Sequence, residues 1–145
     1  MGMKIELITN SANDTIEFGK SVARAVGSGS VISLVGDLGA GKTTFTKGVA
    51  RAMGILDCVT SPTFTILNEY VGEEARLYHF DFYRIEDESE LEELGFEDYF
   101  PSSDGLTIVE WVEKAPSVLP KRFYQITFEK IDDDRRRIIF EEIEK

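Results

Sequence analysis

The residues from Gly36 to Thr43 read Gly-Asp-Leu-Gly-Ala-Gly-Lys-Thr and fit the pattern G-x-x-x-x-G-K-[ST] at every fixed position. With average composition, this pattern arises by chance in roughly a few windows per hundred thousand. The β-branched run Val31–Val35 before it is typical of a buried strand, and residues 44–53 after it carry apolar side chains at helical spacing. A strand, a glycine-rich loop and a helix in this order predict a phosphate-binding loop.

Each residue type in this loop contributes to holding the phosphates of a nucleotide. Glycines adopt positive φ angles and let backbone N–H groups approach phosphate oxygens. Lys42 places a charge against the β- and γ-phosphates, and the Thr43 hydroxyl is placed to ligate Mg²⁺. The N-terminus of the following helix adds unpaired N–H groups and a partial positive charge. We therefore expect nucleotide contacts from the loop residues Asp37, Leu38, Gly39, Ala40, Gly41, Lys42, Thr43 and Thr44.

Two acidic side chains stand where strands are predicted to end. Leu77–Asp81 is an apolar strand that finishes in an aspartate, and phosphate-loop ATPases use such a carboxylate to hold Mg²⁺ directly or through water. Glu110 lies at the end of the apolar strand 106–111, where a carboxylate can orient water or support Mg²⁺. Trp111 is either a core aromatic or a cover over the site. His79 is expected to pack or hydrogen-bond within the sheet without a role of its own.

Residues 59–64 contain a proline flanked by hydroxyl groups, Ser61-Pro62-Thr63. Proline fixes one φ angle and removes a backbone donor. Two interpretations stay open: a loop that leads into a strand, or a switch whose hydroxyl or amide senses the γ-phosphate. In the second interpretation, Ser61 and Thr63 contact the nucleotide.

The remainder of a nucleotide pocket is less well defined by the sequence. The run Arg135–Arg137 is expected to form a charged edge that discourages aggregation, and contact between one of these arginines and the nucleotide is the less favoured alternative. Arg84 is the arginine nearest in sequence to a predicted site residue. We expect the adenine pocket around Thr9–Asn13 and the C-terminal hairpin.

Charge and cysteine content exclude some functions. The net charge of −11 argues against this chain being the main grip on nucleic acid, so we expect no direct DNA binding and only indirect contact with RNA. The single cysteine, Cys58, allows no internal disulfide and fits a reducing compartment. No apolar run reaches membrane-spanning length, and the N-terminus lacks a signal-peptide core. We therefore expect a cytoplasmic protein.

The periodicity of apolar residues predicts one α/β domain over residues 1–145. Because strands 31–35 and 106–110 both deliver site residues at their carboxyl ends, they should be parallel to each other. The hairpins should add antiparallel strands, which gives a three-layer phosphate-loop NTPase fold with a mixed sheet. The expected strands are 4–8, 31–35, 64–71, 75–83, 106–111, 123–130 and 136–143, and the expected helices run from the capping residues 9–15 to Val26, from 44 to 53 and from 86 to 94.

Four blocks of the sequence are informative together: Gly36–Thr44, Ser61–Phe64, His79–Arg84 and Val109–Trp111. In their order and spacing, over essentially the whole chain, they resemble the bacterial TsaE family, also called YjeE. The chain departs from the family at Val112, where a proline usually follows the Glu-Trp pair, and at Phe82, where a leucine is common.

The resemblance implies a Mg²⁺-dependent ATPase that assists formation of N6-threonylcarbamoyladenosine at position 37 of tRNAs reading codons that begin with A. Family members associate with the TsaB–TsaD pair and do not perform the transfer. By this resemblance Thr43 and Asp81 would serve Mg²⁺, and Glu110 would be catalytic, a metal ligand or both. Lys42 and Asp81 would complete the catalytic set, and residues 61–63 would be the switch.

Three other functions fit the sequence less well. A small-molecule or nucleoside kinase shares the loop, but it also needs an acceptor pocket and a lid, for which the chain has little spare length. A GTPase switch is disfavoured because no asparagine precedes a lysine as in the guanine-reading motif. A nucleotide-binding scaffold without turnover is disfavoured by Asp81 and Glu110. Because an activating arginine is hard to identify, we expect hydrolysis to be slow alone and stimulated by partners.

Overall fold

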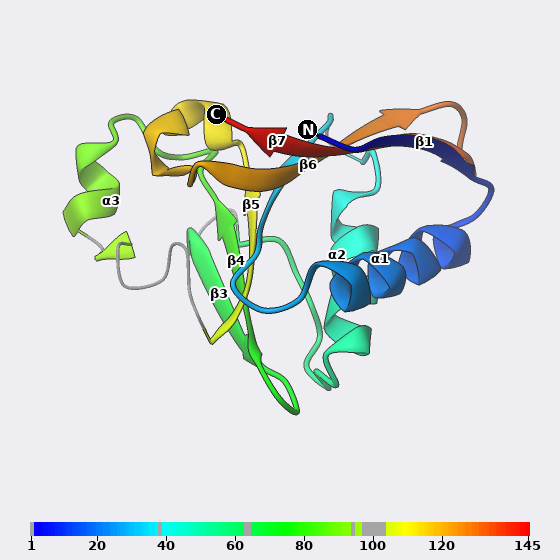
Figure 1. Ribbon diagram of the computed structural model, residues 1–145, viewed down its shortest axis with the longest axis horizontal. Helices are drawn as coiled ribbons and strands as arrows, with labels where there is room; N and C mark the ends of the chain where they lie inside the picture. The colour runs from blue at the N-terminus through cyan, green and yellow to red at the C-terminus, as the bar shows by residue number, and fades with distance from the viewer. Residues whose placement is uncertain (1, 38, 63–64, 94, 97–103) are drawn as a thin grey trace.

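A seven-stranded mixed sheet forms the centre of the computed structural model, which describes residues 2–37, 39–62, 65–93, 95–96 and 104–145 (Figure 1). The strand order is β1-β7-β6-β2-β5-β4-β3. The strands are β1 (Lys4–Thr9), β2 (Val31–Val35), β3 (Leu67–Val71), β4 (Arg76–Asp81), β5 (Gly105–Glu110), β6 (Arg122–Lys130) and β7 (Arg136–Glu144). The predicted α/β fold with a mixed sheet is confirmed.

The pairing of the strands also follows the prediction. β2 is parallel to β5, and β4 and β6 extend this parallel centre on either side. The two hairpins, β3 with β4 and β6 with β7, are antiparallel, and β1 closes the sheet antiparallel to β7. The three central strands β2, β5 and β4 therefore end at the same edge of the sheet, which is where ligands bind in open α/β sheets.

Helices α1 (Ala12–Val26) and α2 (Lys42–Ala52) cover one face of the sheet (Figure 1). The Ser11 hydroxyl caps α1 by accepting from the Asp14 amide at 3.1 Å, as expected for a residue in the predicted capping segment. α2 begins two residues earlier than predicted, because Gly41 in the left-handed region leads the chain directly into helical geometry at Lys42. Phe45 and Val49 of α2 pack in the core with Ile108 of β5.

Shorter helices cover the other face. They are α3 (Ser89–Glu93) and the 3₁₀ turns η2 (Val112–Lys114) and η3 (Pro116–Val118), packed around Phe80, Phe82 and Val109. α3 starts later than the predicted residue 86, because the Glu90 carboxylate accepts from the Glu86 and Asp87 amides at 2.7 and 3.2 Å and holds them as a cap. No helix in the described part of the chain is long and apolar enough to cross a membrane.

Two glycines let the backbones of α1 and α2 approach each other closely. A Cβ atom on Gly19 would meet the Phe45 carbonyl oxygen, and one on Gly48 would meet the Ile16 carbonyl oxygen. Both obstacles are backbone atoms, which cannot swing aside as a side chain can. The crossing fixes the position of α2, and α2 carries the phosphate-binding loop at its N-terminus.

We predict that Gly48→Ala destabilises the protein by about 1–3 kcal/mol, the usual range for overpacking a tight core. In an unhindered helix the same change would stabilise the protein by roughly 1 kcal/mol. The sign of the change in unfolding free energy therefore shows whether α1 and α2 cross as closely as described. Urea unfolding followed by circular dichroism measures it. Lys47→Ala, at the exposed neighbouring position, is the control and should leave the midpoint almost unchanged. A more stable Gly48→Ala protein would contradict the close approach of the two helices.

Candidate nucleotide-binding site

The loop between β2 and α2 owes its shape to glycines in backbone conformations that other residues rarely adopt. Gly36, Gly39 and Gly41 have φ angles of 151°, 79° and 111°. At Gly36 a Cβ atom would also lie 2.7 Å from the Phe128 carbonyl oxygen of β6. The Ala40 amide donates to the Asp37 carbonyl at 3.0 Å and closes the turn. Substitution at Gly36 would therefore displace the loop from β6.

A cavity of about 550 Å³ lies beside this loop, at the carboxyl ends of β4 and β5. Of the other predicted residues, Ala40 packs its side chain in the core, and Leu38 and Thr63 lie outside the described residues. Tyr83, Trp111 and Arg136 complete the lining. The predicted site residues that it brings together are Asp37, Gly39, Gly41, Lys42, Thr43, Thr44, Ser61, Asp81 and Glu110.

The two predicted carboxylates are neighbours because of the strand register. Asp81 of β4 is paired with Glu110 of β5, and both side chains are buried, at 3% and 4% exposure. One oxygen of Asp81 accepts from the Tyr83 amide at 2.9 Å, and the other accepts from the Ser61 hydroxyl at 3.3 Å. The segment predicted as a loop or a switch is therefore connected directly to the carboxylate at the end of β4.

Glu110 is held between two nitrogen groups. Its Oε2 lies 2.7 Å from His79 Nε2, and its Oε1 lies 3.4 Å from Lys42 Nζ. Burial raises the pKa of Glu110, but the hydrogen bond and charge of His79 and the charge of Lys42 lower it by more, so that the pKa lies below its ordinary value. The carboxylate is therefore ionised at neutral pH.

Trp111 forms part of the cavity wall and also packs against the core around Phe82 and Val109, so the structure supports both predicted alternatives, a core aromatic and a cover over the site. Its backbone is left-handed, with a φ of 59°, and this turns the chain out of the strand after Glu110. Lys42 Nζ lies 5.3 Å from the centre of the indole ring, and the Tyr83 ring packs on it at 5.0 Å. A strained conformation at this position suits a residue with a functional task.

Only one of the three adjacent arginines reaches the cavity. Arg136 donates to the Gly39 carbonyl at 3.2 Å and to the Asp132 carbonyl at 2.6 Å. Arg135 pairs with Asp132, and Arg137 lies in an exposed group with Glu6 and Glu129, as expected for a charged edge. Alternation along the strand could have identified Arg136 in the sequence, because residues 136, 138 and 140 lie on the same face of β7. Ile138 and Phe140 are buried on the side of the sheet that α2 covers, so Arg136 lies on that side too.

The oxygen donors at the cavity fit magnesium. Among the described residues, no group of three or more His, Cys, Asp and Glu side chains is arranged to hold a metal. Mg²⁺ does not need such a cage, because it keeps several waters and usually takes one or two carboxylates together with substrate phosphates. The Thr43 hydroxyl and the carboxylates of Asp81 and Glu110, all lining one cavity, provide that kind of donor set.

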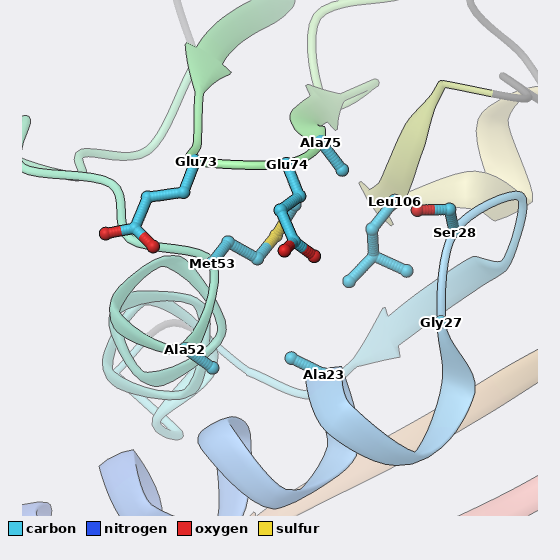
Figure 2. Close-up of a pocket in the computed structure, with 9 residues that line it drawn as sticks. All are labelled: Ala23, Gly27, Ser28, Ala52, Met53, Glu73, Glu74, Ala75 and Leu106. Carbon is cyan, nitrogen blue, oxygen red and sulfur yellow. The ribbon is translucent and has the colours of Figure 1, made fainter.

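A second cavity, of about 370 Å³, lies at the opposite ends of the strands (Figure 2). It is enclosed by the C-terminal ends of α1 and α2 and by the turn between β3 and β4. Glu73 and Glu74 are its charged residues, and none of the predicted site residues that the structure describes lines it. The motifs of the sequence therefore converge on the first cavity.

Comparison with known proteins agrees with the motifs that meet there. The family model described as threonylcarbamoyl adenosine biosynthesis protein TsaE matches residues 9–138. This chain belongs to the TsaE family. The matched range begins at the end of β1 and extends into β7, so it includes every residue of the cavity.

Relatives within the TsaE family match over most of their length. The tRNA threonylcarbamoyladenosine biosynthesis protein TsaE of Bacillus subtilis is 46% identical over 132 residues, which cover 91% of this chain and 82% of that protein. The TsaE protein of Treponema pallidum is 38% identical over 90% of this chain and 96% of its own length. The crystal structure of Bacillus subtilis YdiB superimposes with a TM-score of 0.82 at 38% identity, covering 99% of this chain and 88% of that chain.

The lowered pKa of Glu110 predicts how stability depends on pH. A carboxylate whose folded-state pKa is depressed stabilises the protein above about pH 4.5, its ordinary pKa, and this stabilisation is lost as the pH falls through the lower folded-state value. Glu110→Gln, which cannot titrate, should therefore lose less stability than the original protein when the pH is lowered from 6 towards 3.

Urea unfolding in metal-free buffer at several pH values measures this effect. The control is Glu113→Gln, which changes an exposed carboxylate three residues further along the chain and should leave the pH dependence unchanged. If the free energy of unfolding changed with pH by the same amount in Glu110→Gln and in the original protein, the charged environment described for Glu110 would be contradicted.

Proposed function

We propose that this chain is a Mg²⁺-dependent ATPase that assists the synthesis of threonylcarbamoyladenosine in tRNA. The observation that carries the ATPase proposal is the single cavity in which a phosphate-binding loop meets Asp81 and Glu110. The tRNA-modification role is supported by the names of the relatives in the TsaE family. A cytoplasmic location follows from that role as an expectation.

Nucleotide binding in this cavity would change the partner of Lys42. Its side chain is only 8% exposed, and its ammonium group lies against Glu110 and the Trp111 ring. A γ-phosphate offers more negative charge than one carboxylate, so we expect Lys42 to turn towards the phosphates and leave Glu110 Oε1 free. Bound Mg²⁺ would neutralise the charge that develops on the β- and γ-phosphate oxygens.

Glu110 and Ser61 have different tasks in this proposal. Because Glu110 stays ionised at neutral pH, it can accept a hydrogen bond from the attacking water or bind the metal. Ser61 bonds to Asp81 and lines the same cavity, so a change in the metal environment of Asp81 would be felt by the segment 59–62. This connection supports the switch interpretation of that segment.

The adenine of the bound nucleotide would lie next to Arg136. A smaller cavity of about 410 Å³ is lined by Asn10 and the turn residues 132–135, which are the two segments predicted for adenine. The Arg136 guanidinium connects this turn to the phosphate loop, because it donates to the carbonyls of both Asp132 and Gly39. We therefore propose that the adenine is held between the segment at Asn10 and the hairpin, with the Arg136 guanidinium near the phosphates.

We predict that Glu110→Gln lowers ATP hydrolysis by roughly 10²–10³-fold, the range for loss of a residue that acts on the reacting groups, and changes nucleotide affinity little. Lys42→Ala should weaken binding itself. Phosphate release measures the rate, and a fluorescent ATP analogue measures affinity. Glu113→Gln is the matched control and should behave as the original protein. Unchanged hydrolysis by Glu110→Gln would contradict the catalytic role.

The same assay distinguishes the second candidate, a small-molecule or nucleoside kinase. With γ-labelled ATP, an ATPase releases the label as inorganic phosphate, whereas a kinase transfers it to an acceptor. A labelled acceptor formed at the rate of ATP loss would replace the ATPase proposal by the kinase.

We predict that a TsaB–TsaD complex raises the steady-state ATPase rate by at least about tenfold. Phosphate-loop enzymes hydrolyse their nucleotide slowly when a partner protein must supply part of the catalytic site. When the partner binds, the rate of such enzymes rises by far more than tenfold. The acidic net charge of −11 suits an accessory protein better than one that grips tRNA. Equal rates with and without the complex would contradict the partnership and leave the ATPase proposal standing.

A further inference from the structure

The only histidine of the chain lies inside the sheet, directly below the candidate site. His79 is in the middle of β4, two residues before Asp81, and its side chain is fully buried, at 0% exposure. The sequence predicted a packed or hydrogen-bonded side chain without a role of its own. The hydrogen bond is present, but its partner is Glu110, the carboxylate to which the proposed function assigns the chemistry.

The two oxygens of Glu110 are held by groups of different kinds. Oε2 faces His79, a short, rigid and buried ring at 2.7 Å. Oε1 faces Lys42 at 3.4 Å, a long side chain that lines the cavity and whose ammonium group is the natural partner of an incoming phosphate. When the lysine turns to a phosphate, Oε1 is released and Oε2 is not.

The hydrogen-bonding chemistry of this pair requires a proton on one ring nitrogen, Nε2. An ionised carboxylate only accepts, so His79 donates from Nε2. Nδ1, the other ring nitrogen, is buried without a hydrogen-bond partner among the described residues. A buried polar atom without a partner costs free energy, and the paired residue on β5, Ile108, is apolar. A leucine would pack here without that cost, which points away from a purely structural purpose.

We infer that His79 is a positioning residue for ATP hydrolysis. It holds Oε2 of Glu110 so that Oε1 alone faces the attacking water or the metal. The inference rests on the proposed function, because it assumes that Glu110 takes part in hydrolysis. Beyond that function, it identifies His79 as the residue that orients the Glu110 carboxylate and Oε1 as the oxygen that takes part in hydrolysis.

Three substitutions at position 79 test the inference. His79→Leu removes the donor and should lower kcat for ATP by roughly 10–100-fold, as loss of an orienting partner does in other sites. His79→Gln keeps an N–H group near the position of Nε2 and should recover most of kcat. His79→Asn carries an amide that is too short to reach Glu110, so it should resemble His79→Leu. In all three, KM for ATP and nucleotide affinity should stay within about threefold, because His79 does not line the cavity.

The control is Thr107→Val on the adjacent strand β5. Thr107 is buried, and its hydroxyl has no hydrogen-bond partner among the described residues. It is paired with Tyr78 and shares the face opposite to His79. Losing this hydroxyl removes a buried polar group from the same part of the sheet without touching Glu110, so kcat should be unchanged.

A double variant separates failure of this inference from failure of the proposed function. If His79 acts through Glu110, then His79→Leu has no further effect on kcat in a Glu110→Gln background. A His79→Leu protein that hydrolyses ATP at the original rate, or a further loss in the Glu110→Gln background, would overturn the inference while leaving the ATPase intact. Full activity of Glu110→Gln alone would overturn the proposed function instead.

A spectroscopic measurement on the nucleotide-free and metal-free protein needs no variant to fold. Because the chain has a single histidine, its ring nitrogens give one set of signals in a long-range ¹H–¹⁵N correlation spectrum. We expect Nε2 to carry a slowly exchanging proton at neutral pH. A neutral ring protonated on Nδ1, with a bare Nε2, would overturn the inference.

Discussion

The parallel pairing of β4 with β5 is the constraint on which the rest of the site depends. It sets Asp81 beside Glu110 at one edge of the sheet, and the pairing of β5 with β2 brings the phosphate-binding loop to the same edge. The crossing of α1 and α2 through Gly19 and Gly48 then fixes the helix that extends from the loop. A shift of one residue in the register of β4 would turn Asp81 to the opposite face and separate the two carboxylates.

The charged side chains of the site stabilise one another. Lys42, Asp81 and Glu110 are all buried, and a buried charge is tolerated only with partners. Glu110 has two cationic or hydrogen-bonding neighbours, and Asp81 accepts from Ser61 and from a backbone amide. A nucleotide with a metal ion would replace some of these contacts by others of the same type. The cavity therefore presents groups that are already desolvated, which strengthens their electrostatic interaction with a ligand.

Much of the fold and of the candidate site was predictable because local patterns encode it. The phosphate loop, the two strand-ending carboxylates and both hairpins were identified, and the parallel pairing of β2 with β5 followed from where chemistry must be delivered. The length of α3 was overestimated, because the Glu90 carboxylate caps two amides that helical periodicity would have included. The sequence did not single out Arg136 as the arginine that reaches the cavity, because three consecutive arginines cannot be distinguished until it is known which face of the strand each one occupies. His79 was assigned no role, because its partner is 31 residues away.

The sequence by itself determined the identities and local conformations of this site. Glycines at fixed spacing require the left-handed turns of the loop, and alternating apolar residues require strands, because both effects act within a few residues. Only the tertiary structure decided which side chains meet. Pairing of β4 with β5 joins His79 to Glu110, and packing of the C-terminal hairpin brings Arg136 to Gly39. These contacts depend on strand order and register, which result from burying the apolar surface of the whole sheet rather than from any single segment.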